Sequence, residues 1–324
     1  MPDVRSILIF RNGSIGNTLA AVPALKCIRT SYPQTRITVV VDAVGRELLL
    51  HCPYMDELIV YDKRGQHSGV SGFVRTAVAL RRTAPDRAIL FKRFYRNGLL
   101  AFLSGATDRI GYATAGRAPF LTSTIPYDES VHVAELNLRL ARHAGAHTVN
   151  DAVPELHFST EELAAFADWR ANFGIRDPYV AVHFGGVTGG ASFVAQEWRA
   201  PLVRGLCASR QVLLVGRGAR EVAEAEQLHE QLPESKLALN LPLRLSMLLI
   251  SHAVAFIGTN SGPMHLAAAA RVPGIALFRN DERFDVERVK WRPQFDQLAV
   301  VPVGSEDTAE SFLSKAENSW PSLS

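Results

Sequence analysis

FIGTNSGPMHLAAAARVPGIALF, residues 256–278, gives the clearest indication of a fold in this sequence. Its start belongs to the apolar run Ala253–Gly258, and its end is a second apolar run, Gly274–Phe278. A glycine-containing loop and the helical pattern Pro263–Ala270 lie between the two runs. Short runs that are apolar on both faces are typical of strands in a parallel sheet covered by helices. The stretch therefore predicts a strand, a helix and a second, parallel strand.

The same alternation of strand and helix patterns continues along both halves of the chain. Further strands are expected at Ser6–Phe10, Arg36–Val41, Glu57–Tyr61, Arg87–Phe91, Arg109–Tyr112, Tyr179–His183, Gln211–Val215 and Lys236–Leu239. The helices expected between them are Thr18–Thr30, Gly72–Arg82, Asn97–Ser104, Val131–Ala144, Ala200–Ala208, Ala219–Gln231 and Leu243–Ser251. Two consecutive sets of this kind predict an α/β protein with two doubly wound, Rossmann-like sheets, whose ligands bind at the carboxyl ends of the strands.

The length of 324 residues suits two domains of about 150 residues each. We place them at 1–160 and 161–324, and we expect a tail helix at 306–318 that can pack back on the N-terminal domain. Apolar residues make up 47% of the chain and charged residues 21%, which is ordinary globular composition. The formal charge of +3 does not indicate nucleic acid as a partner.

The sequence predicts a cytoplasmic location. No segment reaches the roughly 20 uninterrupted apolar residues of a membrane span, and the apolar run Ile7–Phe10 is too short for a signal peptide. Cys27, Cys52 and Cys207 are widely spaced, which favours reduced thiols over a disulfide framework or a zinc site. We expect no metal and no cofactor.

The first loop with candidate chemistry is Arg11–Thr18, after the first predicted strand. Gly13 and Gly16 permit a tight turn, and Asn17 or Thr18 can cap the following helix, whose N-terminus suits an anion or a polar substrate. The spacing matches neither GxGxxG nor a Walker A loop. An ordinary glycine-rich turn explains this loop equally well.

Two loops of the second half have similar composition. His183–Gly190 contains four glycines whose N–H groups can surround a phosphate, although a mobile surface loop is the plainer interpretation. Gly258–His265 again joins a strand to a helix with open N–H groups. In that loop, Ser261 is also explained as a helix cap and His265 as a core histidine.

Four stretches together resemble glycosyltransferase family 9, the heptosyltransferase family of bacterial surface-polysaccharide synthesis. They are Ile7–Leu25 (ILIFRNGSIGNTLAAVPAL), Leu100–Tyr112 (LAFLSGATDRIGY), the loop starting at His183, and Phe256–Phe278, which is the most specific. The resemblance implies the GT-B fold, with two Rossmann-like domains facing a central cleft. It further implies an acceptor-binding N-terminal domain and a C-terminal domain that binds a nucleotide-diphosphate sugar as co-substrate. The implied reaction is metal-independent sugar transfer with inversion at the anomeric carbon.

The sequence departs from the family pattern at three positions. Asn17 stands where the family usually has an aspartate, whose implied role is general base, and an amide cannot accept that proton. Asn260 replaces a second aspartate, and Gln196 replaces a lysine or arginine before Trp198. His183, at a strand end expected to face the cleft, is our candidate for taking over the proton.

The expected site residues follow from the loops and the resemblance. The catalytic candidates are Asn17 and His183. The donor-binding candidates are Gly185, Gly186, Gln196, Glu221, Asn260, Ser261, Gly262 and His265. Glu221 matches the carboxylate that meets the nucleoside ribose in the family, and an exposed glutamate at a helix start is its plainer interpretation. The acceptor-binding candidates are Gly13, Ser14, Gly16, Lys92, Arg93 and Arg96.

A basic stretch supports an acidic acceptor. Residues 75–117 contain nine Lys or Arg and two acids, a balance of +7. Three of the cations follow a predicted strand directly and alternate with aromatic residues, which suits an anionic glycolipid or the surface of the inner membrane. We expect a glycosyltransferase that extends a cell-surface glycan or glycolipid such as lipopolysaccharide. The alternatives are a catalytically weak or inactive homologue that binds a nucleotide sugar or a partner enzyme, and another GT-B reaction such as nucleotide-sugar epimerisation.

Overall fold

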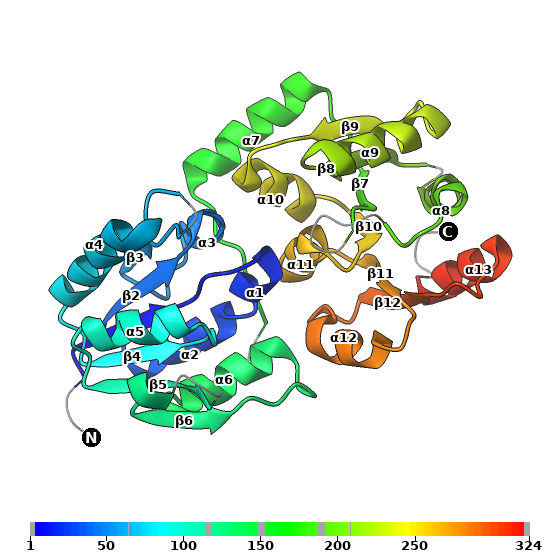
Figure 1. Ribbon diagram of the computed structural model, residues 1–324. Coiled ribbons are helices and arrows are strands. Elements are labelled where there is room, and N and C mark those ends of the chain that lie inside the picture. Colours follow the sequence, from blue (N-terminus) through cyan, green and yellow to red (C-terminus); the bar gives the residue numbers. More distant parts are fainter. Residues whose placement is uncertain are drawn as a thin grey trace. The chain divides into compact units, whose positions relative to one another are not determined.

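The computed structural model describes residues 4–63, 65–113, 118–147, 153–186, 192–207 and 209–320. The chain divides into two compact units, Met1–His157 and Phe158–Ser324. In the described part of the chain, each unit is built around one six-stranded parallel sheet with helices packed on it (Figure 1). No helix in the same ranges is long and apolar enough to cross a membrane.

The N-terminal sheet has the strand order β3-β2-β1-β4-β5-β6. Its strands are β1 (Ser6–Phe10), β2 (Arg36–Val41), β3 (Glu57–Val60), β4 (Arg87–Leu90), β5 (Asp108–Ala113) and β6 (Ser123–Pro126). Its helices are α1 (Ile15–Leu19), α2 (Val22–Ser31), α3 (Ala43–Leu49), α4 (Gly69–Arg82), α5 (Tyr95–Leu103) and α6 (Val133–His143). The first strand lies in the centre, where Ile7 pairs with Ile37 of β2 and with Arg87 of β4.

The C-terminal sheet repeats this arrangement with the order β12-β11-β10-β7-β8-β9. Its strands are β7 (Tyr179–His183), β8 (Gln211–Gly216), β9 (Lys236–Leu239), β10 (Ala255–Thr259), β11 (Gly274–Arg279) and β12 (Leu298–Val303). Its helices are α7 (Thr160–Phe173), α8 (Gln196–Cys207), α9 (Ala219–Gln231), α10 (Leu243–Ser251), α11 (Gly262–Ala269), α12 (Phe284–Trp291) and α13 (Ala309–Ser319). Both sheets are doubly wound, which confirms the predicted fold class.

Central strands are buried on both faces because helices cover both. Leu8 and Phe10 of β1 belong to a core cluster with side chains of α4 and α5, including Leu80 and Leu100. Successive strand residues point to opposite faces, so Ile9 faces the other side, where right-handed connections bring α2. Most of the predicted strands are interior strands, whereas Glu57–Tyr61 and Lys236–Leu239 correspond to the edge strands β3 and β9.

The structure corrects the predicted elements in three ways. Helices α3, α7 and α12 were not predicted. The helix predicted at Thr18–Thr30 is two helices, α1 and α2, because Pro23 in the first turn of α2 cannot continue a helix from α1. Strands β6 and β12 were not predicted. Both lie at sheet edges and contain a proline, Pro126 and Pro302, and edge strands tolerate proline because they pair on one side only.

The C-terminal unit begins with α7, which starts in a capping box formed by Ser159 and Glu162. The tail helix α13 packs on α8 and β12 of the same unit, with Phe312 and Ala316 in its core. The expected tail helix is therefore present, and the buried side of α13 packs within the C-terminal unit.

Candidate functional site

Each sheet has one point where the strand order reverses, and ligands of doubly wound sheets bind outside the carboxyl ends of the strands at such a point. In the N-terminal sheet it lies between β1 and β4, where the loops carry Asn17 and Lys92. In the C-terminal sheet it lies between β7 and β10, where the loops carry Gly185 and Ser261. The candidate residues thus form two separate groups, one in each unit.

The loop after β1 is held by Asp42 at the end of β2. One carboxylate oxygen of Asp42 accepts a hydrogen bond from Gly13 N at 2.8 Å, and the other caps α3 through Gly45 N at 2.9 Å. Gly13 has φ +151°, and a Cβ there would lie 3.1 Å from the Cε atom of Lys92. A glycine is needed at this position for both reasons.

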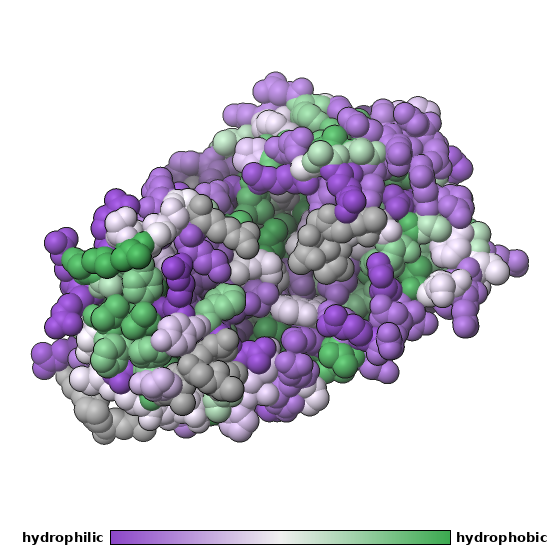
Figure 2. Space-filling view, viewed as in Figure 1, coloured by the Kyte–Doolittle hydropathy of each residue, from purple (hydrophilic) through white to green (hydrophobic). Residues whose placement is uncertain are grey.

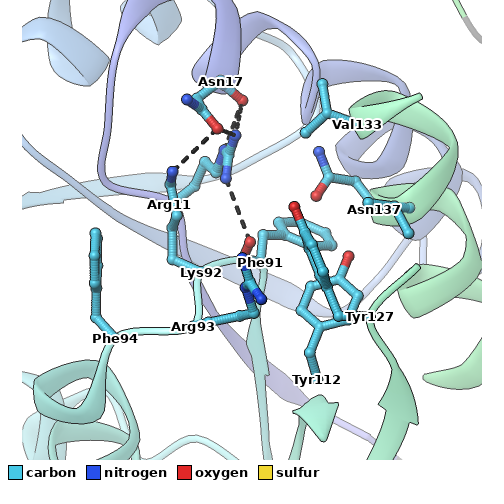
Figure 3. Close-up of a pocket in the computed structure, with 11 residues that line it drawn as sticks. Arg11, Asn17, Phe91, Lys92, Arg93, Phe94, Tyr112, Tyr127, Val133 and Asn137 are labelled. Atoms are coloured by element: carbon cyan, nitrogen blue, oxygen red, sulfur yellow. Dashed lines mark hydrogen bonds between the residues drawn. The ribbon is translucent and has the colours of Figure 1, made fainter. Parts of the chain in front are cut away.

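Three polar side chains converge in the N-terminal group (Figure 3). Arg11 is 1% exposed and donates two hydrogen bonds to Asn17. Its Nε atom donates to the backbone oxygen at 2.7 Å, and a terminal nitrogen donates to Oδ1 at 3.0 Å. Lys92 Nζ lies 3.0 Å from the same Oδ1 atom. The amide nitrogen of Asn17 donates to Ser14 Oγ at 2.9 Å. Asn17 is therefore an oriented neutral acceptor between two cations.

Asn17 and Thr18 lie within α1, and the structure places Ser14 at its N-cap position. The expectation that Asn17 or Thr18 caps the following helix is therefore wrong, because the helix starts earlier. Gly16 is buried in α1.

A cavity of about 330 Å³ opens beside Asn17. Its described lining includes three cations and no carboxylate. The lining residues are Arg11, Asn17, Phe91, Lys92, Arg93, Phe94, Tyr112, Tyr127, Val133, Leu136 and Asn137. Burial lowers the pKa of Arg11 to about 10, so the guanidinium remains charged at neutral pH. Burial raises the pKa of Tyr112, whose hydroxyl remains protonated. The cavity is chemically suited to a negatively charged group.

Of the predicted acceptor residues, Arg93 lines the cavity and Arg96 does not. Arg93 lines the cavity, with its guanidinium carbon 3.6 Å from the ring centre of Tyr127 and a terminal nitrogen 3.7 Å from Glu129. Arg96 is exposed and lies 5.7 Å from the ring of Phe73 on α4, outside the cavity lining. Its place in the first turn of α5 directs it to the neighbouring helix instead.

In the C-terminal group, His183 links the ends of β7 and β10 to α9. Its Nδ1 atom lies 3.1 Å from Ser261 Oγ and its Nε2 atom 3.3 Å from Glu221 Oε2. Burial alone raises the pKa of Glu221, but the nearby imidazole of His183 and the hydrogen bond from Arg217 N hold that pKa below the usual value. Glu221 is thus an oriented, ionised carboxylate.

The side chain of His183 is 1% exposed. Its assignment as a candidate proton acceptor stays a prediction. With both ring nitrogens directed at Ser261 and Glu221, His183 positions other side chains of its unit.

Gly185 lies where no larger residue fits. A Cβ atom there would lie 2.6 Å from His183 Nε2 and 2.9 Å from Glu221 Cδ. The loop backbone is fixed by Thr259 Oγ1, which donates to Gly185 O. The glycine backbone therefore passes directly beside the carboxylate of Glu221, and the adjacent Gly186 is also buried.

Helix α11 starts at Gly262, after Asn260 and Ser261. Ser261 occupies the N-cap position, but its hydroxyl bonds His183 and Thr259 O and does not cap the helix, so the first-turn N–H groups can still bind an anion. His265 lies in α11 with its ring 5.9 Å from that of Trp291, an edge-on contact.

Gln196 is the exposed first residue of α8. Val187–Gly190 of the second glycine loop, Arg117 of the basic stretch and the side chain of Cys207 lie outside the described residues. Among those that are described, no group of three or more His, Cys, Asp or Glu side chains is placed to hold a metal ion.

Sequence reasoning missed several cavity residues. Arg11 belongs to the first loop and was not among the predicted site residues, although an arginine directly after the apolar run Ile7–Phe10 is an unusual buried cation. Tyr112, Tyr127 and Asn137 come from distant elements and carry no local signal.

Comparisons with known proteins agree with this architecture. The sequence matches glycosyltransferase family 9 (heptosyltransferase) over residues 73–309, which is more than half of the chain. Lipopolysaccharide heptosyltransferase 2 of Escherichia coli is 24% identical over 286 residues, covering 84% of this chain and 82% of that protein.

Two solved structures share the fold. The family 9 glycosyltransferase of Veillonella parvula superposes with a TM-score of 0.83 at 19% identity and covers 98% of this chain and 96% of that chain. The ADP-heptose LPS heptosyltransferase II of E. coli superposes with a TM-score of 0.78 at 20% identity, covering 97% and 98%. The protein is a GT-B glycosyltransferase and belongs to glycosyltransferase family 9, the heptosyltransferase family.

Proposed function

We propose that this glycosyltransferase transfers a heptose or a related sugar from a nucleotide-diphosphate donor to an anionic cell-surface glycan or glycolipid such as lipopolysaccharide. The transfer proceeds with inversion, without a metal ion, at the cytoplasmic face of the inner membrane. The names of the two E. coli relatives, which specify ADP-heptose and lipopolysaccharide, support these classes of donor and acceptor.

The observation that carries the donor half is the arrangement at Glu221. Its ionised carboxylate lies against the backbone of Gly185, and the first turn of α11 follows Ser261, which bonds His183 in the same cluster. A carboxylate accepts hydrogen bonds from the hydroxyl groups of a ribose, whereas backbone N–H groups donate hydrogen bonds to a diphosphate. One nucleoside diphosphate satisfies both kinds of group.

The acceptor half rests on the cation-rich cavity. Arg11, Lys92 and Arg93 line it, and its described lining contains no Asp or Glu. Cations that converge on one cavity attract an anionic group of a ligand. We assign the cavity to a carboxylate or phosphate group of the acceptor, with Asn17 orienting a neighbouring hydroxyl.

Thermal unfolding against ADP-, GDP-, UDP- and dTDP-sugars and the free nucleotides tests the donor half. A ligand at 100 times its Kd stabilises the protein by about 2.7 kcal/mol, which raises the unfolding midpoint. We expect the shift with an ADP-sugar and its loss in Glu221→Gln. Glu226→Gln, an exposed change on the same helix, is the matched control and should keep the shift. A flat response to the whole panel would contradict the proposed donor site.

Binding of glucuronate and inorganic phosphate tests the acceptor half. Lys92→Gln is expected to weaken both ligands, because a cation of the cavity lining is lost. Arg96→Gln removes a charge four residues away, outside the lining, and should not affect them. Equal losses in the two variants would show a general charge effect and refute the assignment of the cavity.

A second candidate is a weakly active or inactive homologue that binds a nucleotide sugar or a partner enzyme. It is favoured by Asn17, whose amide oxygen already accepts from Arg11 and Lys92 and cannot take a proton from an acceptor hydroxyl. Sugar transfer by Asn17→Asp separates the two. A rate gain approaching the 10²–10⁴-fold of a typical general base would identify an impaired base position. Little change or a loss, with measurable transfer by the natural protein, would identify a site organised around the amide.

A further inference from the structure

Helix α4 exposes an apolar stripe to solvent. Val70, Val74 and Val78 are 81%, 51% and 48% exposed and follow one another at intervals of four residues. At about 100° per residue, these valines and the exposed Arg81 and Arg82 fall within an arc of about 120°. The opposite side of the helix is buried through Thr76 and Leu80, which are 3% and 0% exposed. The stripe is therefore not part of the core.

Helix α5 packs beside α4 and presents a similar surface (Figure 2). Tyr95, Phe102 and Leu103 are 52%, 49% and 36% exposed and lie on one side of the helix, with the exposed Arg96. Phe94, immediately before the helix, is 43% exposed. Four large apolar side chains thus extend the valine stripe of α4 over the neighbouring helix.

Helices α4 and α5 pack together through the apolar core cluster, and arginines of each helix lie near the other. The Arg96 guanidinium lies 5.7 Å from the ring of Phe73 on α4. A Cβ atom added to Gly105, just after α5, would lie 4.0 Å from a terminal nitrogen of Arg81. The exposed faces of α4 and α5 therefore form one surface, here called the α4–α5 face.

The α4–α5 face is positively charged without compensation in its own helices. Residues 69–82 and 95–103 contain four arginines, Arg75, Arg81, Arg82 and Arg96, and no Asp or Glu. The chain as a whole has 35 basic and 32 acidic residues, so this absence of acids is a local feature. Apolar side chains beside arginines on one helix surface are the pattern of an interfacial membrane helix.

We propose that the α4–α5 face docks on the surface of an anionic lipid bilayer, with the valines and aromatic rings in the interface and the arginines at the headgroups. Charge selects this occupant over a second copy of the chain, because two such faces in contact would bring arginines against arginines. The proposal goes beyond the enzymatic function and does not require it.

The position of Phe94 connects docking to the acceptor. Phe94 lines the cation-rich cavity and is also an exposed residue of the α4–α5 face. Lys63 Nζ lies 4.8 Å and Lys92 Nζ 5.7 Å from the centre of its ring. A lipid-linked acceptor in the same bilayer would reach the cavity along this edge. This link rests on the proposed function, whereas the docking itself does not.

Sedimentation with vesicles tests the proposal without any sugar substrate. The 324-residue protein is expected to bind phosphatidylethanolamine vesicles in which one lipid in four is phosphatidylglycerol, and not vesicles of phosphatidylcholine alone. Because exposed charges are screened by salt, binding should weaken as the salt concentration rises. Each arginine near an anionic surface strengthens binding about fivefold, so Arg81→Gln with Arg82→Gln should weaken it about 25-fold.

A matched pair controls for net charge. Arg46→Gln with Arg283→Gln removes two exposed charges, one from α3 and one from the N-cap of α12, and should leave vesicle binding near that of the natural protein. Equal weakening by the two pairs, or no binding of the natural protein at low salt, would overturn the proposal.

Insertion is measured with a tryptophan in place of one valine. The fluorescence of Val74→Trp should shift to the blue on anionic vesicles and be quenched by brominated lipid. Val286→Trp, at a 46% exposed valine on α12, should show neither change. Equal responses would contradict docking by this face, as would lipid-free dimerisation that Val74→Ser with Val78→Ser abolishes. If the unsubstituted protein binds vesicles but no nucleotide or nucleotide sugar, the proposed function is refuted and the docking proposal is unaffected.

Discussion

Replacing Asn17 by aspartate should stabilise the N-terminal unit and weaken its affinity for anions. The Oδ1 atom of Asn17 lies 3.0 Å from a terminal nitrogen of Arg11 and 3.0 Å from Lys92 Nζ. At an effective dielectric constant of about 20, a carboxylate at this distance attracts each cation by about 5 kcal/mol. Loss of the existing bonds to the amide and desolvation of the carboxylate together offset most of this gain. We estimate a net stabilisation of about 2 kcal/mol, or a rise in Tm of about 4–8 °C.

The stabilisation should depend on pH in one direction. Two neighbouring cations lower the pKa of a carboxyl group in the folded state below its unfolded value of about 3.9. Such a group contributes fully to stability above the unfolded pKa, and the contribution is lost as the pH falls through the folded value. The difference in Tm between Asn17→Asp and the natural protein should therefore be present at pH 7 and decline below about pH 4.

Thermal unfolding at several pH values and phosphate binding by calorimetry provide the assay. The new charge should weaken phosphate binding about tenfold, corresponding to a repulsion of about 1.4 kcal/mol. Asn137→Asp is the matched control, because Asn137 lines the same cavity but donates to Ala20 O at 2.8 Å and should lose stability when that donor is removed. A Tm that is lower or unchanged in Asn17→Asp at pH 7, or a gain that is undiminished at pH 3, would refute this reasoning.

Three further predictions concern the C-terminal unit. Gly185→Ala should weaken ADP binding at least about tenfold in calorimetry, because the added Cβ would lie 2.6 Å from His183 Nε2; an unchanged Kd would contradict the role of this glycine. Glu221→Gln should reduce stability to urea above about pH 4.5 and have less effect as the pH falls through the lowered pKa of Glu221; an equal effect at pH 3 would exclude an ionised Glu221 as the cause. Phe312→Ala should cost about 3–5 kcal/mol in urea unfolding, because the ring is fully buried and stacks on Trp198; a cost below 1 kcal/mol would show that α13 is not integral to this core.

Much of the fold could be predicted from the sequence because the interior strands are locally encoded. Ser6–Phe10 and Tyr179–His183 were predicted with the bounds that the structure has, since a strand buried on both faces needs a continuous apolar run. The edge strands β6 and β12 were not predicted, because an edge strand tolerates proline and partial exposure and its hydrophobic pattern is weaker. The break between α1 and α2 was also available from Pro23, but the apolar pattern on both sides of it obscured the break.

The candidate site was only partly predictable. The loops after the central strands could be selected, because the carboxyl end of a parallel strand is where ligands bind. The exposure of their side chains could not be predicted, because it depends on residues far away in the sequence. His183 is enclosed by Ser261 and Glu221, and Arg96 turns toward Phe73, although both were expected to contact substrate.

By itself, the sequence determined the fold class, the two halves and the strand ends where ligands bind, because these depend on hydrophobic periodicity and on glycine within short segments. Only the tertiary structure decided that Arg11 lies buried beside Asn17 and Lys92, in a cavity completed by Tyr127 and Asn137. It also decided which residues of α4 and α5 remain exposed side by side. Contacts between residues 75 to 120 positions apart arise only after the sheet has formed, and no local pattern specifies them.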